Sequence, residues 1–266
     1  MDTRLKTDFF DLPRPRVIAH RGFSGAYPEN TMPAFHAACA AGAAYLELDV
    51  HLTRDGEVVV IHDDDLRRVA GYDGIIAELD LAAVLAADAG ANFSADGVSY
   101  PFRGKGIRVP TLREVLSACS AQRFIIEIKH SQPSLVRPLL ELIEQSAMST
   151  RVLIASEHQA PLDEVRVLAP SIPTNVSSRE VGFFMMSLAP DAAAYVPLGA
   201  ALQIPPEHLS WQLVTPASVA AAHRMGVEVH VWTVNEVAEM RELLAMGVDG
   251  IITDFPARLL EVVRSA

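Results

Sequence analysis

Three short apolar runs decide how this chain folds: VIAH at residues 17–20, YLELDV at residues 45–50 and FIIEIK at residues 124–129. Each run consists mainly of aliphatic and aromatic residues, and each carries charged or ionisable side chains toward its end. Runs of this length and composition are typical of strands that are buried on both faces of a parallel sheet. Stretches with helical spacing lie between these runs and others like them.

The alternation of strands and helices along the chain predicts a closed barrel. Strands are expected near residues 18, 47, 126, 154, 173, 202, 230 and 251, and eight such βα units imply a (β/α)8 barrel. The length of 266 residues suits one barrel, and a hydrophobic content of 50% is sufficient for its core. We therefore expect an α/β fold, a TIM barrel, in which residues 1–266 form a single catalytic domain. An open, doubly wound sheet is the alternative.

Residues from about 64 to 108 interrupt this alternation. Six glycines lie in the segment, and only residues 79–87 have a helical pattern. Just before it, the turn sequence TRDG at residues 53–56 predicts a β-hairpin that returns His62 toward the end of the second strand. We expect the segment to be a small insertion after strand two, either a lid at the top of the barrel or a poorly structured decoration.

The charge of the chain disfavours several classes of partner. Its 22 basic and 33 acidic residues give a net charge of −11 at pH 7, and the basic residues form no cluster. Such a chain repels nucleic acid and anionic membranes. An anionic substrate must therefore be captured locally, by a metal ion or by a few cationic side chains, and the expected partner is a small molecule.

Cysteines and apolar runs give expectations about the compartment. Cys39 and Cys119 have neither disulfide-framework nor zinc-ligand spacing, so we expect two thiols. Charged residues interrupt the first twenty positions, and no apolar run reaches the roughly 18–20 residues that span a bilayer. These features predict a cytoplasmic protein without stable membrane insertion, and they leave open whether it forms a homodimer.

Polar residues gather at the strand ends where a barrel carries its active site. In (β/α)8 barrels that site lies at the carboxyl ends of the strands. The first expected strand ends at His20, and the second ends with Glu47 and Asp49. The third ends with Glu127 and Lys129. Residues i and i+2 of a strand share a face, so the two members of each pair point the same way.

Three carboxylates, those of Glu47, Asp49 and Glu127, are therefore expected to converge from neighbouring strands. Charged groups inside an apolar barrel are costly unless they are paired or bind a metal. Mg²⁺ and Ca²⁺ both accept carboxylate oxygens, so the sequence predicts a divalent metal site at this rim. The alternative is a structural ion pair between Glu127 and Lys129 across the mouth of the barrel.

His20 and His62 are expected to meet at the same rim. A single histidine at a strand end is more often structural than catalytic. Two at one rim suggest a general acid and a general base on opposite sides of a phosphorus atom. Arg21 and Lys129 would supply positive charge to the oxygens of a phosphodiester. Either histidine can begin as the base.

Seven short motifs occur in the order found in glycerophosphodiester phosphodiesterases, and the resemblance runs from residue 17 to about residue 258. They are HRG (20–22), PENT (28–31), ELDV (47–50), HD (62–63), EIK (127–129), WTVN (232–235) and TDFP (253–256). The resemblance implies a metal-dependent hydrolase on a (β/α)8 barrel. Its substrates would be glycerophosphodiesters such as glycerophosphocholine or glycerophosphoethanolamine, split into an alcohol and sn-glycerol 3-phosphate.

The same resemblance implies roles for individual residues. In that family the three carboxylates hold the metal, the two histidines perform acid–base catalysis, and the matches to Arg21 and Lys129 bind phosphate. The sequence departs from the family after the His-Asp pair, where an Arg-Thr-Thr is frequent and Arg68 is here followed by Val69. Further expected contacts with the substrate are Trp232, Gln203 and Phe23.

Two other functions are compatible with the sequence. A lysophospholipase D or a phospholipase C-like lipid phosphodiesterase would use the same barrel. Such an enzyme would gain from an apolar or basic rim that contacts lipid, which residues of the insertion allow: Phe93, Tyr100, Phe102, Arg103 and Lys105. The other alternative is a barrel without catalytic activity that serves as a binding module.

Overall fold

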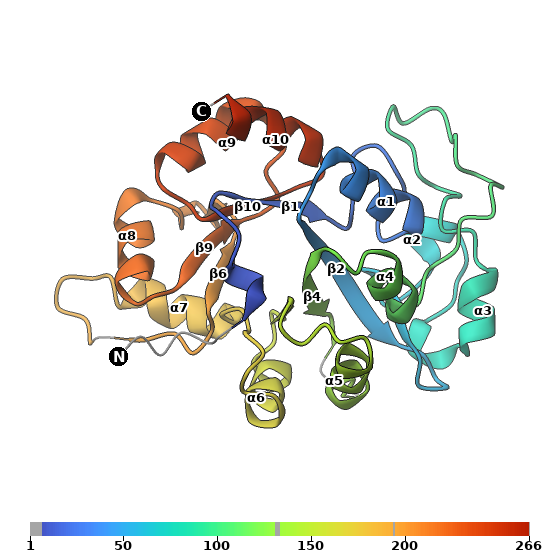
Figure 1. Cartoon of the computed structure of the whole chain (residues 1–266), viewed down its shortest axis with the longest axis horizontal. Coiled ribbons are helices and arrows are strands. Elements are labelled where there is room, and N and C mark those ends of the chain that lie inside the picture. Colours follow the sequence, from blue (N-terminus) through green and yellow to red (C-terminus); the bar gives the residue numbers. More distant parts are fainter. Residues whose placement is uncertain (1–6, 131–133, 194, 266) are drawn as a thin grey trace.

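The computed structural model describes residues 7–130, 134–193 and 195–265, which form a barrel of parallel strands with helices around the outside (Figure 1). In their order around the sheet, the strands are β5 (Val152–Ala155), β4 (Arg123–Ile128), β2 (Tyr45–Leu52), β1 (Arg16–His20), β10 (Gly250–Thr253), β9 (Glu228–Val231) and β6 (Ala201–Ile204). Each strand pairs in parallel with its neighbours in this order.

The barrel closes through a segment too short to form a full strand. Thr174 bridges to Ile154 of β5, and Asn175 bridges to Ala201 of β6, both in parallel. The Ile154 amide donates to the Pro173 carbonyl (2.9 Å), and the Asn175 amide donates back to the Ile154 carbonyl (3.0 Å). The strand expected near residue 173 is thus reduced to two bridges, in part because Pro173 has no amide hydrogen to extend the ladder. The predicted (β/α)8 fold is confirmed.

The helices alternate with the strands, as the periodicity predicts. They are α1 (Met32–Ala41), α4 (Leu112–Ala118), α5 (Val136–Gln145), α6 (Gln159–Leu168), α7 (Ser178–Met186), α8 (Pro216–Arg224), α9 (Val237–Ala245) and α10 (Pro256–Arg264). At the start of α4, the Thr111 side chain accepts from the Glu114 amide and the Glu114 carboxylate accepts from the Thr111 amide, which completes a capping box. Within the described part of the chain, no helix has both the length and the apolar character needed to cross a membrane.

The hairpin predicted after strand two is present. β3 (Val58–Val60) pairs antiparallel with β2, with Val60 opposite Val50, and the chain then returns through His62 to the rim. The following insertion contains α2 (Arg67–Ala70), η2 (Ile76–Glu78) and α3 (Leu81–Ala86). Its apolar side chains form a small buried cluster with Val59 and Ile61 of the hairpin. The first part of the insertion therefore packs onto the hairpin, whereas its residues 88–108 form no helix or strand.

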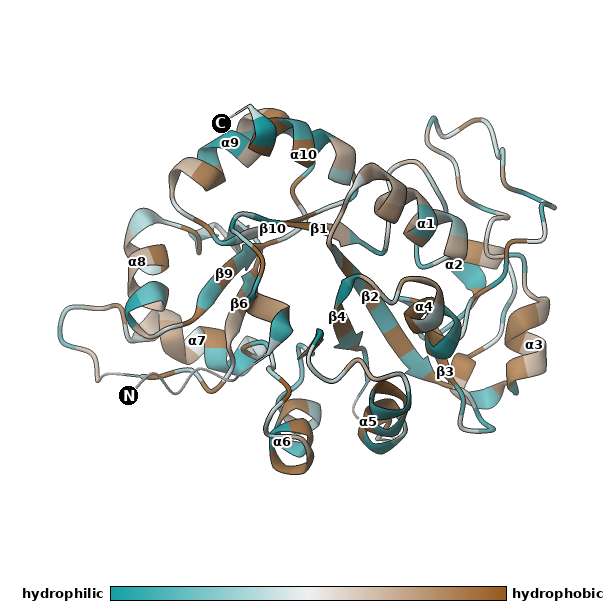
Figure 2. Cartoon of the chain, in the orientation of Figure 1, coloured by the Kyte–Doolittle hydropathy of each residue, from teal (hydrophilic) through white to brown (hydrophobic). Residues whose placement is uncertain are grey.

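Hydrophobic and hydrophilic residues alternate along β2, as the banding of this strand in Figure 2 shows. Leu46, Leu48 and Val50 belong to the apolar layer between the sheet and the helices. Glu47 and Asp49 lie on the opposite face of the strand, toward the barrel interior, because successive side chains of a strand point to opposite faces. One strand thus contributes to the core with one face and to the functional site with the other.

The N-terminal arm fills the base of the barrel. The short 3₁₀-helix η1 (Asp8–Phe10) places Phe9, which is fully buried, against Tyr45, with ring centroids 5.3 Å apart. The Phe9 amide donates to the carbonyl of Thr150 (2.9 Å). Pro13 and Pro15 predict an irregular arm before the first strand, and part of that arm is this short helix. Residues 1–6 lie outside the described residues.

A buried ion pair lies next to this arm. Arg16, at the start of β1, is 2% exposed and donates twice to the Glu228 carboxylate of β9, at 2.7 Å each. Arg16 also donates to the Tyr45 hydroxyl (2.6 Å), and the His230 ring contacts Glu228 at 3.0 Å. Burial alone would raise the pKa of Glu228, but the hydrogen bonds from Arg16 and His230 outweigh it and lower this pKa. The carboxylate therefore stays ionised inside the protein.

Cys39 and Cys119 are free thiols, as expected, but they are neighbours in space. Cys39 lies in the last turn of α1 and Cys119 caps the end of α4, and their sulfur atoms are 3.6 Å apart. The two helices end near the starts of β2 and β4, which are adjacent strands. Spacing along the sequence does not predict this proximity, because it depends on how the helices pack.

Replacing Arg16 with alanine should lower the free energy of unfolding by about 3–5 kcal/mol, because Glu228 would keep a buried charge with fewer partners. Arg151→Ala removes a guanidinium whose side chain is 40% exposed, and should cost less than about 1 kcal/mol. Urea unfolding followed by circular dichroism measures both losses. Small and equal losses in the two variants would contradict this account of the barrel base.

Candidate active site

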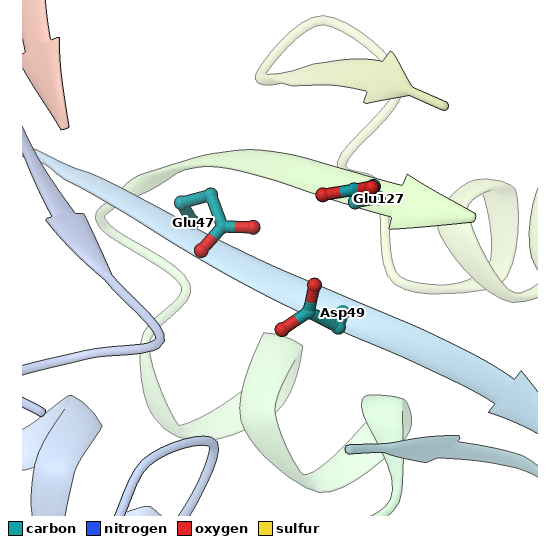
Figure 3. Close-up of side chains that lie close together, drawn as sticks. All are labelled: Glu47, Asp49 and Glu127. Carbon is teal, nitrogen blue, oxygen red and sulfur yellow. The ribbon is translucent and has the colours of Figure 1, made fainter. Parts of the chain in front are cut away.

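The strand register brings the predicted carboxylates to one part of the barrel. Glu47 of β2 lies opposite His20 of β1, and Asp49 of β2 lies opposite Glu127 of β4. Figure 3 shows the three carboxylates close together, two from β2 and one from the neighbouring strand. One oxygen of each carboxylate lies within 4.8 Å of the others.

Three carboxylates this close, with little access to water, destabilise one another. Glu47 is 4% exposed and Asp49 is 1% exposed. Burial, together with the neighbouring charge of Asp49, raises the pKa of Glu47 to about 8. Burial also raises the pKa of Glu127, against the effect of Lys129. A cluster of carboxylate oxygens whose own charges repel suits a hard divalent cation, so the donor set fits the metal that the sequence predicts.

Arg21 and Lys129 bring positive charge to this cluster. Arg21 Nε lies 3.1 Å from Asp49 Oδ2, and Arg21 Nη1 donates to Glu29 Oε1 at 2.9 Å. Lys129 Nζ lies 3.0 Å from Glu127 Oε1 and 3.5 Å from Asp49 Oδ1. The ion pair between Glu127 and Lys129, offered above as the alternative to a metal site, is present. It forms part of the carboxylate cluster and does not replace it.

A left-handed turn after β1 places Arg21. Arg21 has φ +53° and Gly22 has φ +82°. In this turn the Arg21 amide donates to Glu47 Oε2 (3.0 Å). A Cβ at position 22 would lie 2.7 Å from the carbonyl carbon of Ala34 in α1, so glycine is required there. Non-glycine residues rarely adopt positive φ, and those that do cluster at functional sites.

Both predicted catalytic histidines are held by an aspartate. His20 Nδ1 lies 2.6 Å from Asp254 Oδ1, and His62 Nδ1 lies 2.6 Å from Asp63 Oδ1. A carboxylate at Nδ1 keeps the proton on that nitrogen and leaves Nε2 to exchange protons. Burial alone would lower the pKa of His20, but the hydrogen bond with Asp254 and the charge of Glu47 outweigh burial and raise it.

One cavity at this rim unites most of the predicted site. Its lining includes His20, Arg21, Glu47, His62, Glu127, Lys129, Gln203 and Trp232. Phe23 is not among the residues that line this cavity. Its ring packs near those of Tyr27 and Phe255, with centroids 6.1 Å and 6.5 Å away. A contact between Phe23 and substrate stays a prediction, as do the roles assigned to the lining residues.

The structure adds residues that the sequence did not single out. Glu157 and Asn175 line the cavity. Glu157 follows β5 by two residues, so the rule that points to strand ends would have found it. Asn175 lies at the end of the strand expected near residue 173, so the same rule points to it as well. Asp63 and Asp254 lie within motifs that the sequence reveals, but their contacts with the two histidines can be seen only in the structure.

A barrel whose cavity carries two histidines bound to aspartates, a carboxylate cluster and two cations has the arrangement of a phosphoric diester hydrolase. The model of the Glycerophosphoryl diester phosphodiesterase family matches residues 20–258, and the chain belongs to this family. A glycerophosphodiester phosphodiesterase from Caldanaerobacter subterraneus subsp. tengcongensis is 32% identical over 255 residues, which cover 93% of this chain and 97% of that protein.

Solved structures agree with the fold. A candidate glycerophosphoryl diester phosphodiesterase from Silicibacter pomeroyi superposes with a TM-score of 0.78 at 30% identity, covering 95% of each chain. A phosphodiesterase from Oleispira antarctica, in complex with the product sn-glycerol-3-phosphate, has a TM-score of 0.77 at 25% identity, with 94% of this chain and 97% of that chain covered. A lysophospholipase D from Mus musculus is more distant, at 27% identity over 94% of this chain and 86% of that protein.

Replacing Glu127 with glutamine should weaken the binding of Mg²⁺ or Ca²⁺ by about tenfold or more, because one of three charged ligands is lost. Glu141→Gln, on the exposed face of α5, makes the same chemical change away from the cluster and is the matched control. Isothermal titration calorimetry with the metal alone measures both variants. Equal affinities in the two would exclude the carboxylate cluster as the metal site.

The metal affinity should also depend on pH because the pKa of Glu47 is raised to about 8. Below that pH the carboxyl carries a proton that the metal must displace, so affinity falls as the pH drops from 8 to 6. Above pH 8 the group is ionised and the affinity levels off. Titrations in two buffers of different ionisation enthalpy count the released proton. An affinity that is constant between pH 6 and pH 8 would contradict this prediction.

Proposed function

We propose that this chain hydrolyses glycerophosphodiesters to an alcohol and sn-glycerol 3-phosphate. The observation that carries the proposal is a single cavity lined by His20 and His62, each held by an aspartate, together with carboxylates and two cations. Membership of the family supports it, as does the product complex of the Oleispira antarctica phosphodiesterase.

Arg21 and Lys129 are the proposed binding residues for the phosphodiester. The planar guanidinium of Arg21 donates in fixed directions that match two phosphate oxygens, whereas the Lys129 ammonium acts as a point charge. Both already lie against Asp49, at 3.1 Å and 3.5 Å. The carboxylate cluster thus holds the two cations toward the place where the substrate's non-bridging oxygens would lie.

Glu47, Asp49 and Glu127 are the proposed ligands of a divalent cation, Mg²⁺ or Ca²⁺. When bound, this ion would supply Lewis-acid polarisation of the phosphoryl group and neutralise charge that develops there. The support for this assignment is the chemistry of the donor set, three crowded carboxylates of which two are nearly inaccessible to water.

His20 and His62 are the proposed acid–base pair. The glycerol 2-hydroxyl attacks phosphorus while one histidine accepts its proton at Nε2 and the other protonates the leaving alcohol. Water then opens the cyclic phosphate with the two roles exchanged. Asp254 and Asp63 fix the rings for both steps, and general acid–base catalysis of this kind contributes typically about 10²–10⁴-fold.

Gln203 and Trp232 are proposed to contact the organic part of the substrate. They line the cavity from β6 and from the end of β9, and Trp232 is 37% exposed. Residues 1–266 are proposed to act as one catalytic domain with the insertion at about 64–108. Action in the cytoplasm and the formation of a homodimer stay predictions.

Lysophospholipase D activity is the second candidate, and the mouse relative favours it. Tyr100, one of the aromatic residues expected to contact lipid, is 41% exposed. Phe93 and Phe102, however, pack on each other, with ring centroids 5.3 Å apart. Co-sedimentation with liposomes, followed by assay on lysophosphatidylcholine, separates the two functions, since clear binding and lipid turnover would favour the second.

His20→Ala and His62→Ala should each lower kcat on the preferred glycerophosphodiester by about 10²-fold or more while leaving the melting temperature close to that of the unaltered protein. His208→Ala, at an exposed position in β7 (Glu207–His208), is the control. The assay is release of sn-glycerol 3-phosphate from choline, ethanolamine, inositol and glycerol diesters, with EDTA and with added metal. Near-normal turnover in both histidine variants would refute the mechanism.

A further inference from the structure

Arg68 connects two parts of the site that come from different segments of the chain. It lies in α2 of the insertion, and its Nε donates to Asp63 Oδ2 at 2.6 Å. Its two terminal nitrogens donate to the two oxygens of Glu29, at 2.8 Å and 2.7 Å. Leu66, at the start of α2, is fully buried and so holds the backbone of the helix that carries Arg68 against the protein.

The two carboxylates that Arg68 binds each hold a residue of the cavity. Asp63 contacts His62 Nδ1 at 2.6 Å, and Glu29 accepts from Arg21 Nη1 at 2.9 Å. A continuous chain of charge-assisted hydrogen bonds therefore runs from His62 to Arg21 with Arg68 at its centre. We propose that Arg68 is a positioning residue that sets the orientation of His62 and of Arg21 together.

The electrostatics agree with this geometry. Burial alone would raise the pKa of both Asp63 and Glu29, but the hydrogen bonds and charge of Arg68, with those of His62 and Arg21, outweigh it and lower both values. Both carboxylates therefore stay ionised. An ionised Asp63 is required to keep the proton of His62 on Nδ1, and an ionised Glu29 is required to hold the Arg21 guanidinium.

The other histidine is held differently. Asp254, which contacts His20, accepts hydrogen bonds from the Ser24 hydroxyl (2.8 Å) and the Asn235 amide (2.7 Å), both of which are uncharged donors. These donors come from loops that follow β1 and β9. The His62 side of the site thus depends on a charged group from the insertion, and the His20 side on neutral groups of the barrel. This assigns the insertion a role in the site.

The neighbouring arginine supplies a matched control. Arg67 precedes Arg68 in α2 and pairs with Asp73, and these side chains are 71% and 79% exposed. Arg67→Ala and Arg68→Ala remove the same group from the same helix, but the Arg68 side chain, which is 48% exposed, binds the two carboxylates that hold His62 and Arg21, and Arg67 does not. The inference rests on the proposed function, so both are measured beside the unaltered protein and His62→Ala.

Arg68→Ala should lower kcat/KM about tenfold to hundredfold, through a lower kcat and a higher KM, since small displacements of reacting groups cost this much. Arg67→Ala should leave both constants unchanged, and melting temperatures should match. Arg68→Lys should recover only part of the loss, because an ammonium lacks the planar fork that spans both carboxylates. Calorimetry with sn-glycerol 3-phosphate should show weaker binding for Arg68→Ala, reporting on Arg21 without turnover.

Double variants separate the two halves of this series of hydrogen bonds, one from Arg68 through Asp63 to His62 and the other from Arg68 through Glu29 to Arg21. In an Asp63→Asn background, Arg68→Ala should act mainly on KM and product affinity; in a Glu29→Gln background, it should act mainly on kcat. Kinetic constants for Arg68→Ala equal to those of Arg67→Ala would overturn the inference and leave the proposed function standing. Absence of turnover by the unaltered protein, or normal turnover by His62→Ala, would instead overturn the proposed function.

Discussion

The close approach of Glu47, Asp49 and Glu127 is the constraint on which the rest of the site depends. Three carboxylates that repel one another, two of them nearly inaccessible to water, must be compensated by positive charge. Arg21 and Lys129 supply part of that compensation and are thereby fixed in place. The same crowding suits a divalent cation. The proposed metal-binding and phosphate-binding roles therefore both follow from this concentration of negative charge.

The alternation of side chains along one strand, β2, is sufficient to position two of the three carboxylates. Along β2, every second residue belongs to the apolar core and the residues between them face the interior. A shift of one residue would bury Glu47 against the helices and turn Leu48 into the cavity. The apolar layer thus enforces the register that aligns Asp49 with Glu127. Stability and function are specified by opposite faces of the same strand.

The parts of the fold that follow local periodicity could be predicted from the sequence. The barrel, the hairpin, the capping box at Thr111 and the convergence of the carboxylates all follow from residue spacing and one rule about strand ends. The parts that depend on how separate elements pack could not be predicted. Arg68 and Glu29 are 39 positions apart and meet only because the insertion folds back, and the sulfur atoms of Cys39 and Cys119 meet only because two helices end side by side. A strand is expected near residue 173, but the sequence does not predict that it is reduced to two bridges between β5 and β6.

That closing segment has a consequence for the mechanics of the barrel. A ring of strands is joined there through the single-residue bridges of Thr174 and Asn175, whereas β2 and β4 pair over six positions. Asn175 also lines the cavity, and its side chain accepts a hydrogen bond from the Ser156 amide (3.1 Å). A molecule that touches both Asn175 and the β2 side of the cavity spans the seam of the ring. A molecule bound in the cavity would then stabilise the barrel against opening at the closing segment, where the strands are joined by single-residue bridges.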